Sequence, residues 1–94
     1  MAAMLRRYGP FHTVFHLAAQ PGVRWCESNV TEAHRGNYGV THKLLEAIST
    51  CCRESTWSLP HIIFSSSSCV YGSAPQPWVE DRNPAPIGVY GQMK

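Results

Sequence analysis

Two short apolar runs separated by a long helical stretch constrain the fold of this chain most strongly. Residues 12–18 form a branched, apolar run bounded by Gly9-Pro10 and Pro21-Gly22, and residues 61–66 form a second such run. Both runs predict buried strands. Between them, apolar residues recur every three or four positions over residues 30–53, which predicts a helix with one apolar face. A strand, a helix and a second strand form a right-handed crossover with parallel strands. The fold class predicted is α/β, as part of a doubly wound parallel sheet.

The segments that flank the two predicted strands indicate where a binding site is expected. Residues 2–8 are expected to be helical, and residues 19–29 to form a loop. The proline-rich segment 71–86 cannot continue a sheet or a helix and is expected on the surface. Ligands of doubly wound sheets bind at the carboxyl ends of the strands. Residues 18–20 and 65–67 are therefore expected to border a binding site.

Composition excludes several classes of function. A 94-residue chain with 44% hydrophobic and 15% charged residues fits one globular unit, and the net charge of +2 comes from dispersed Lys and Arg, so nucleic-acid binding is not expected. No apolar stretch approaches the roughly 20 residues of a membrane span, and the start lacks a signal-peptide core. The four cysteines include no Cys-x-x-Cys pair, so we expect reduced thiols and no metal site. The location expected is the cytosol.

Tyr90 and Lys94 indicate redox chemistry on a hydroxyl group. Their spacing of four places both side chains on one helical face, about one turn apart. A free tyrosine has a pKa of about 10, and a close positive charge lowers that pKa. The phenol could then act as a base, while a serine from a strand end holds the substrate hydroxyl. This arrangement predicts conversion of a hydroxyl to a carbonyl.

Several segments, taken together, resemble the extended short-chain dehydrogenase/reductases, and within them the NAD-dependent epimerase/dehydratase group that acts on nucleotide sugars. Residues 14–20 look like the family's fourth strand, and residues 62–67 like its fifth. The helix between them and the segments after them follow in the family's order: Asn37, Thr41, residues 44–47, 70–72 and 77–80, Tyr90 and Lys94. The resemblance covers most of the chain and implies a Rossmann-like NAD-binding domain.

The resemblance implies a role for each site residue. Tyr90, ionised with help from Lys94, takes the proton of a sugar hydroxyl while the adjoining carbon gives hydride to NAD, and Ser67 hydrogen-bonds the oxygen as it becomes a ketone. Ser67 is chosen by its offset from residues 70–72, and Ser66 and Ser68 lie one position away. The cofactor-binding residues implied are Ala18, Ala19, Gln20, Asn37, Ser65, Tyr90 and Lys94.

Asn37 lies on the apolar face of the predicted helix. A buried amide must find hydrogen-bond partners. Asn37 therefore either bridges to the strand that resembles the family's fourth, residues 14–20, or lies near the cofactor.

The choice of substrate rests on residues 16–20 and 22–25, which look most like the UDP-glucuronate 4-epimerases. Arg24 could pair with a substrate carboxylate through two hydrogen bonds, or it could be a solvated loop arginine. A UDP-sugar is therefore the substrate implied, with a 4-keto sugar as intermediate. Other NAD-dependent dehydratases and decarboxylases of sugar nucleotides stay open as alternatives, and relatives imply a homodimeric parent.

The family's glycine-rich turn, which holds the cofactor pyrophosphate, is not found in this sequence. We therefore expect residues 1–94 to be a partial NAD-binding domain from inside a larger enzyme, without its N-terminal strands and C-terminal substrate-binding part. Such a chain by itself is expected to be inactive and to aggregate through an exposed sheet edge and apolar faces. The alternative is a non-catalytic fragment that binds a partner.

Overall fold

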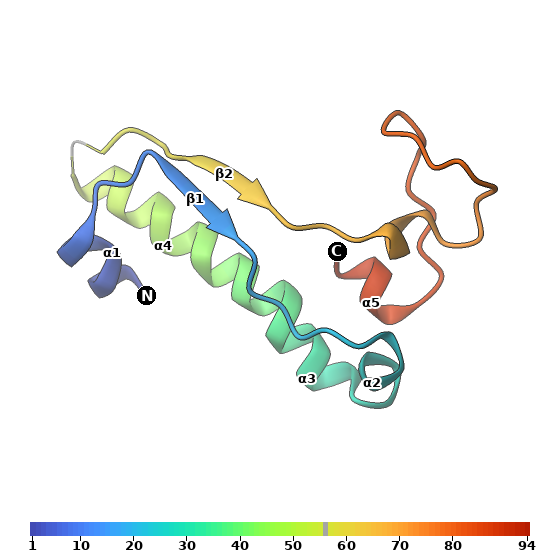
Figure 1. The fold of residues 1–94 in the computed structure, drawn as a ribbon. Coiled ribbons are helices and arrows are strands. Elements are labelled where there is room, and N and C mark those ends of the chain that lie inside the picture. The colour runs from blue at the N-terminus through green and yellow to red at the C-terminus, as the bar shows by residue number, and fades with distance from the viewer. Residues whose placement is uncertain (56) are drawn as a thin grey trace.

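The computed structural model describes residues 1–55 and 57–94. Two strands pair in parallel, with Thr13 opposite His61 and His16 opposite Phe64, and a long helix connects them (Figure 1). This arrangement confirms the predicted strand, helix and parallel strand. The elements in chain order are α1 (Ala2–Tyr8), β1 (Thr13–His16), α2 (Val23–Ser28), α3 (Val30–His34), the π-helical turn η1 (Arg35–Gly39), α4 (Val40–Glu54), β2 (His61–Phe64), the 3-10 turn η2 (Ser68–Tyr71) and α5 (Val89–Gln92).

The helical connection is not the regular helix that the sequence predicts. From Val30 to Glu54 the chain stays helical, but Arg35–Gly39 forms a π-helical turn between α3 and α4. Asn37 lies in this wider turn, and its backbone carbonyl accepts a hydrogen bond from the Thr41 hydroxyl. π-helical turns inside α-helices occur frequently at functional sites. This one lies alongside the segment that follows β1.

The core lies between the sheet and α4. Leu5 of α1 and Ala47, Ile48 and Cys51 of α4 form the buried cluster. Val14 and Ile62, which face each other across the two strands, pack against this cluster. Side chains alternate between the two faces of a strand, so one face of the sheet is joined to α4 while the other points away from it.

The sheet face away from α4 is open. Phe15 is 64% exposed, Leu17 just beyond β1 is 68% exposed, and Ile63 is 40% exposed. The shortest dimension of the molecule is 16 Å, which fits one sheet on one layer of helices, whereas a doubly wound domain has helices on both faces. The prediction that both strands are buried is therefore wrong for this chain. The expected exposure of an apolar sheet face is confirmed.

Several boundaries also differ from the sequence predictions. β1 ends at His16, so residues 17–20 follow the strand rather than extend it. β2 ends at Phe64 instead of residue 66. Residues Val23–Ser28 form α2 where a loop was predicted, because tertiary contacts support a helix too short to be stable alone. α5 ends at Gln92, so Lys94 lies just beyond the helix that carries Tyr90. Within residues 1–55 and 57–94, each helix is too short or too polar to cross a membrane.

Candidate functional site

The two strands end side by side. The Ser65 N–H, just beyond β2, donates to the His16 carbonyl at 3.2 Å, which continues the parallel pairing past the last strand residues. Ala18 and Ser65 are exposed, and Ala19 and Gln20 are half-buried. The structure thus brings residues 18–20 and 65–67 to one edge of the sheet. This edge is where the ligands of doubly wound sheets bind.

Asn37 fastens the segment after β1 to the helix. Its side-chain oxygen accepts the Gln20 N–H at 3.0 Å, and its side-chain nitrogen donates to the Gln20 carbonyl at 3.2 Å and to the Ala33 carbonyl at 2.9 Å. Asn37 is only 2% exposed, so both of its N–H groups and its oxygen are used inside the protein. Of the two roles considered for Asn37, the structure has the bridging one. Direct contact with a cofactor stays a prediction.

His16 joins the end of β1 to α4 as a neutral ring. Its Nε2 lies 2.8 Å from the Thr41 hydroxyl oxygen. Because that hydroxyl donates its hydrogen to the Asn37 carbonyl at 2.9 Å, Nε2 must carry the ring hydrogen. Burial lowers the pKa of His16, and the nearby charge of Lys94 acts in the same direction. The His16 ring also packs against Phe64, its partner in the sheet register.

The serines after β2 make different contacts. The Ser67 hydroxyl oxygen accepts the Cys69 N–H at 3.2 Å and caps η2. Within residues 1–55 and 57–94 the Ser67 O–H has no acceptor, so it can donate to another oxygen. The Ser66 hydroxyl donates its hydrogen to the Lys94 carbonyl at 3.2 Å. These contacts favour Ser67 over Ser66 as the serine that could hold a substrate oxygen.

The segment that carries Tyr90 and Lys94 packs beside this serine run. Gly91 is buried, and a Cβ at that position would lie 2.6 Å from the Cys69 carbonyl oxygen, so α5 contacts η2 closely. The Lys94 Nζ lies 4.6 Å from the centroid of the Phe64 ring at the end of β2. Partial burial lowers the pKa of Lys94. Tyr90, on α5, is half-buried.

α2 adds two residues to the surroundings of the site. Arg24 lies exposed in the first turn of this helix, where its assignment to a substrate carboxylate stays a prediction. Glu27, which the sequence did not single out, accepts the Val89 N–H at 2.7 Å and so reaches the start of α5. No local sequence pattern links these two residues, because they are 62 positions apart.

The strand ends fit the reactive part of a nicotinamide cofactor. Ala18 and Ala19 have small side chains beside the ends of β1 and β2, so a flat ring could approach the backbone there. Lys94 supplies a positive charge and Ser65 an exposed hydroxyl at the same edge. The chain therefore offers groups for the nicotinamide end of the cofactor, while its sequence has no glycine-rich turn for the pyrophosphate.

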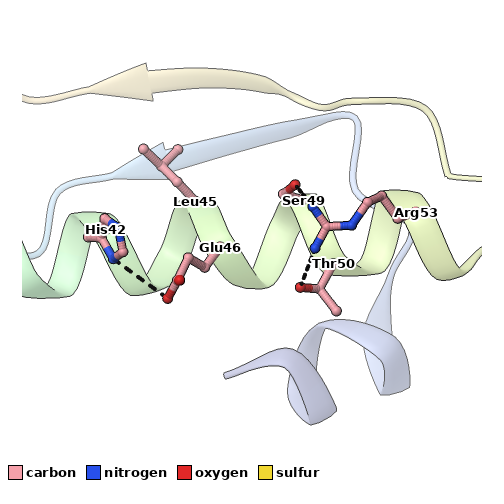
Figure 2. Close-up of a pocket in the computed structure, with 6 residues that line it drawn as sticks. All are labelled: His42, Leu45, Glu46, Ser49, Thr50 and Arg53. Carbon is pink, nitrogen blue, oxygen red and sulfur yellow. Dashed lines mark hydrogen bonds and ion pairs between the residues drawn. The ribbon is translucent and has the colours of Figure 1, made fainter.

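A surface groove lies elsewhere, along the outer side of α4. It is lined by residues of this helix alone: His42, Leu45, Glu46, Ser49, Thr50 and Arg53 (Figure 2). Arg53 donates to the Ser49 hydroxyl at 2.9 Å, and His42 lies 3.6 Å from Glu46. The polar groups of this groove thus pair with one another, and none of the predicted site residues line it.

Comparison with known sequences supports the family. The NAD dependent epimerase/dehydratase family matches residues 1–94. The chain is 37% identical over 87 residues to UDP-glucuronate 4-epimerase 3 of Arabidopsis thaliana, which covers 90% of this chain and 19% of that protein. It is also 37% identical over 82 residues to an uncharacterized UDP-glucose epimerase of Bacillus subtilis (strain 168), covering 86% of this chain and 24% of that protein. The chain thus spans about a fifth to a quarter of these relatives.

Solved structures agree with the sequence comparison. The UDP-glucose 4-epimerase from Brucella ovis in complex with NAD has a TM-score of 0.80 and 31% identity, covering 98% of this chain and 26% of that one. MoeE5 in complex with UDP-glucose and NAD has a TM-score of 0.79 and 35% identity, covering 98% of this chain and 28% of that one. Both were solved in complex with NAD, and each likeness covers 98% of this chain. The chain therefore has the Rossmann-type α/β fold of these epimerases. The chain belongs to the NAD-dependent epimerase/dehydratase family.

Proposed function

We propose that this chain contributes the catalytic residues of an NAD-dependent nucleotide-sugar 4-epimerase of the UDP-glucuronate type. One observation carries the proposal. The Ser66 hydroxyl bonds to the Lys94 carbonyl across 28 positions of sequence, so the serine run and the Tyr90–Lys94 segment meet at the end of β2. Oxidation of a sugar hydroxyl is assisted by a base that takes the proton and by a hydrogen-bond donor to the reacting oxygen, and these two segments offer both.

Each of these residues has a separate task in the proposed reaction. The Tyr90 phenolate accepts the proton of the sugar 4-hydroxyl and later returns it. Lys94 would contribute its positive charge on the same segment as the negative charge moves from Tyr90 to the substrate oxygen. The Ser67 O–H, which has no acceptor among the residues that the structure describes, donates a hydrogen bond to the sugar oxygen as that oxygen becomes a carbonyl. The 4-keto sugar then presents its other face before it is reduced, which inverts the configuration at that carbon.

The cofactor would be held by the residues around the strand ends. Ala18, Ala19 and Ser65 would border the nicotinamide, and Lys94 would also reach the ribose. Gln20 and Asn37 would keep the segment after β1 in place, because their three hydrogen bonds fix its backbone. NAD, when bound, supplies the acceptor and later the donor of the hydride.

The substrate proposed is a UDP-sugar, and UDP-glucuronate in particular. The Arabidopsis relative is a UDP-glucuronate 4-epimerase, and MoeE5 has also been solved in complex with UDP-glucuronic acid and NAD, at a TM-score of 0.80 and 35% identity. Arg24 is exposed on α2, where its guanidinium is available to pair with the uronate carboxylate.

Two proteins are tested. One is the 94-residue chain, and the other is the longest polypeptide with this sequence that the gene encodes, which is called the parent polypeptide below. NAD binding is measured by calorimetry on both, and turnover of UDP-glucuronate and UDP-glucose is followed by separating the products. Tyr90→Phe should lower kcat of the parent by about 10²–10⁴-fold, as expected for loss of a general base. Tyr8→Phe, at the exposed end of α1, is the matched control and should leave kcat unchanged.

The products and the binding data separate the alternatives. Epimers of the substrate support the proposal, whereas a dehydrated or decarboxylated sugar would assign the chain to another branch of the family. Equal activity of Tyr90→Phe and wild type would refute the role of Tyr90. Tight NAD binding by the 94-residue chain would refute the expectation that it is an incomplete site.

A second candidate function is a non-catalytic fragment that binds a partner. The observation that favours it is the open sheet face with Phe15, Leu17 and Ile63 exposed. A stable complex that forms without NAD or UDP-sugar binding would support this alternative. We also propose a cytosolic location, tested by cell fractionation.

A homodimeric parent is part of the same proposal. Tyr38 and Leu45 are exposed on the outer side of the helical path from α3 to α4 and could pack in such a dimer. The molar mass of the parent polypeptide, measured by light scattering, distinguishes a dimer from a monomer.

A further inference from the structure

We propose that Glu27 is a positioning residue that fixes the helix carrying Tyr90 and, just beyond it, Lys94. The inference rests on the proposed function, because it matters for catalysis only if Tyr90 is the base. Glu27 lies on α2, away from the serine run, and belongs to none of the sequence motifs that indicated the site.

The contact joins two elements that are distant in sequence. One oxygen of the Glu27 carboxylate accepts the Val89 N–H at 2.7 Å, and Val89 is the first residue of α5. The first N–H groups of a helix have no partner within the helix. Because the acceptor is a carboxylate, the bond is charge-assisted, which is the stronger class of hydrogen bond.

The backbone next to this contact is shaped to admit the carboxylate. A Cβ on Gly88 would lie 2.6 Å from the same Glu27 oxygen. Its φ of −97° and ψ of 164° are open to any residue, so space rather than backbone conformation favours glycine at this position. The carboxylate and the absence of a side chain at residue 88 thus complement each other.

α2 is itself anchored to the strand end. Cys26, the neighbour of Glu27, is fully buried, and its thiol lies 3.7 Å from the Gln20 carbonyl. Gln20 in turn is held by the side chain of Asn37. A continuous series of contacts therefore runs from the π-helical turn through the segment after β1 and α2 to the start of α5.

α5 needs such support because it has only four residues, far fewer than a helix requires to persist alone. Its other end is held by the Ser66 bond to the Lys94 carbonyl, and its middle by the packing of Gly91 on Cys69. Removing the Glu27 contact leaves the first turn of α5 free to rotate about these remaining contacts. Tyr90 follows Val89 directly, so its hydroxyl would shift relative to the substrate.

The experiment compares Glu27→Ala, Glu27→Gln and Glu32→Ala in the parent polypeptide. Glutamine keeps an oxygen that can accept the Val89 N–H, whereas alanine has none. Glu32 is exposed on α3, so Glu32→Ala makes the same change of charge on a neighbouring helix. Four quantities are measured: the amide proton shift of Val89 by NMR, kcat, KM for the UDP-sugar and Kd for NAD.

We expect Glu27→Ala to move the Val89 amide proton upfield and to lower kcat about tenfold or more, since small misplacements of reacting groups are costly. Kd for NAD should stay within about twofold. Glu27→Gln should recover most of kcat, and Glu32→Ala should match wild type. An unchanged Val89 shift in Glu27→Ala would overturn the contact, and an unchanged kcat would overturn the positioning role. Wild-type protein without turnover would instead refute the proposed function, and the Val89 shift would still decide the contact.

Discussion

Removing the Asn37 side chain tests whether this residue holds the segment after β1 in place. Asn37→Ala deletes three hydrogen bonds, to the Gln20 N–H, the Gln20 carbonyl and the Ala33 carbonyl. A hydrogen bond contributes about 0.5–1.5 kcal/mol net to stability. Three of them at a site that is 2% exposed give an expected loss of about 2–4 kcal/mol in the free energy of unfolding.

The replacement by aspartate sharpens this prediction. The carboxylate that Asn37→Asp introduces could still accept the Gln20 N–H, but it has no N–H to offer the two carbonyls that Asn37 now serves. It would also bring a buried negative charge close to both carbonyl oxygens. At pH 7 we therefore expect Asn37→Asp to be at least as destabilising as Asn37→Ala.

The assay is urea unfolding of the parent polypeptide followed by circular dichroism, with equal slopes required before free energies are compared. Asn83→Ala, an exposed asparagine in the long loop, is the matched control and should change stability by less than about 0.5 kcal/mol. Hydrogen exchange at the Gln20 N–H should also speed up, by about tenfold for each 1.4 kcal/mol lost locally. A stability for Asn37→Ala within about 0.5 kcal/mol of wild type would refute the reasoning.

Three further predictions follow from other contacts. Because its pKa is lowered in the folded state, His16 contributes stability that is complete above its ordinary pKa of 6.5 and is lost as the pH falls below that value. When the free energy of unfolding is measured against pH, His16→Gln should lose less stability at low pH than wild type. Equal losses of stability in the two proteins would contradict this prediction. Gly91→Ala should destabilise by about 1–3 kcal/mol through overpacking against Cys69. Helix propensity alone predicts the opposite, a gain in stability of about 1 kcal/mol. Urea unfolding measures the change in the free energy of unfolding, and its sign tells the two apart. In the 94-residue chain, Phe15→Thr combined with Ile63→Thr should reduce dye binding and light scattering, because both side chains are exposed on the open sheet face. Threonine still favours strands, so the fold should be kept. Unchanged aggregation would mean that another surface is responsible.

The secondary structure could be predicted from local patterns where those patterns were long. The helix from residue 30 onward and the apolar runs at residues 12–18 and 61–66 appear in the structure as α3 to α4, β1 and β2. The π-helical turn could not be predicted, because its signature is a set of contacts between Asn37, Gln20 and Thr41 rather than a pattern of apolar spacing. α2 was missed for the same reason, since a six-residue helix depends on packing.

The candidate site was predictable in its residue types and less so in its geometry. The spacing of Tyr90 and Lys94 and the serine run after β2 were visible in the sequence. Which serine has a free hydroxyl hydrogen was not, because Ser66 and Ser67 differ only in their tertiary partners. The cofactor and substrate contacts of these residues remain predictions.

The sequence alone therefore determined the order of elements, the parallel crossover and the chemical groups placed after each strand, because hydrophobic periodicity and residue type are local properties. The tertiary structure decided which groups meet. The bond of Glu27 to Val89 spans 62 positions and that of Ser66 to Lys94 spans 28, and no local pattern encodes contacts of such separation. The open sheet face is also a tertiary property, because the same apolar strand reads as buried until the layers that cover it are known.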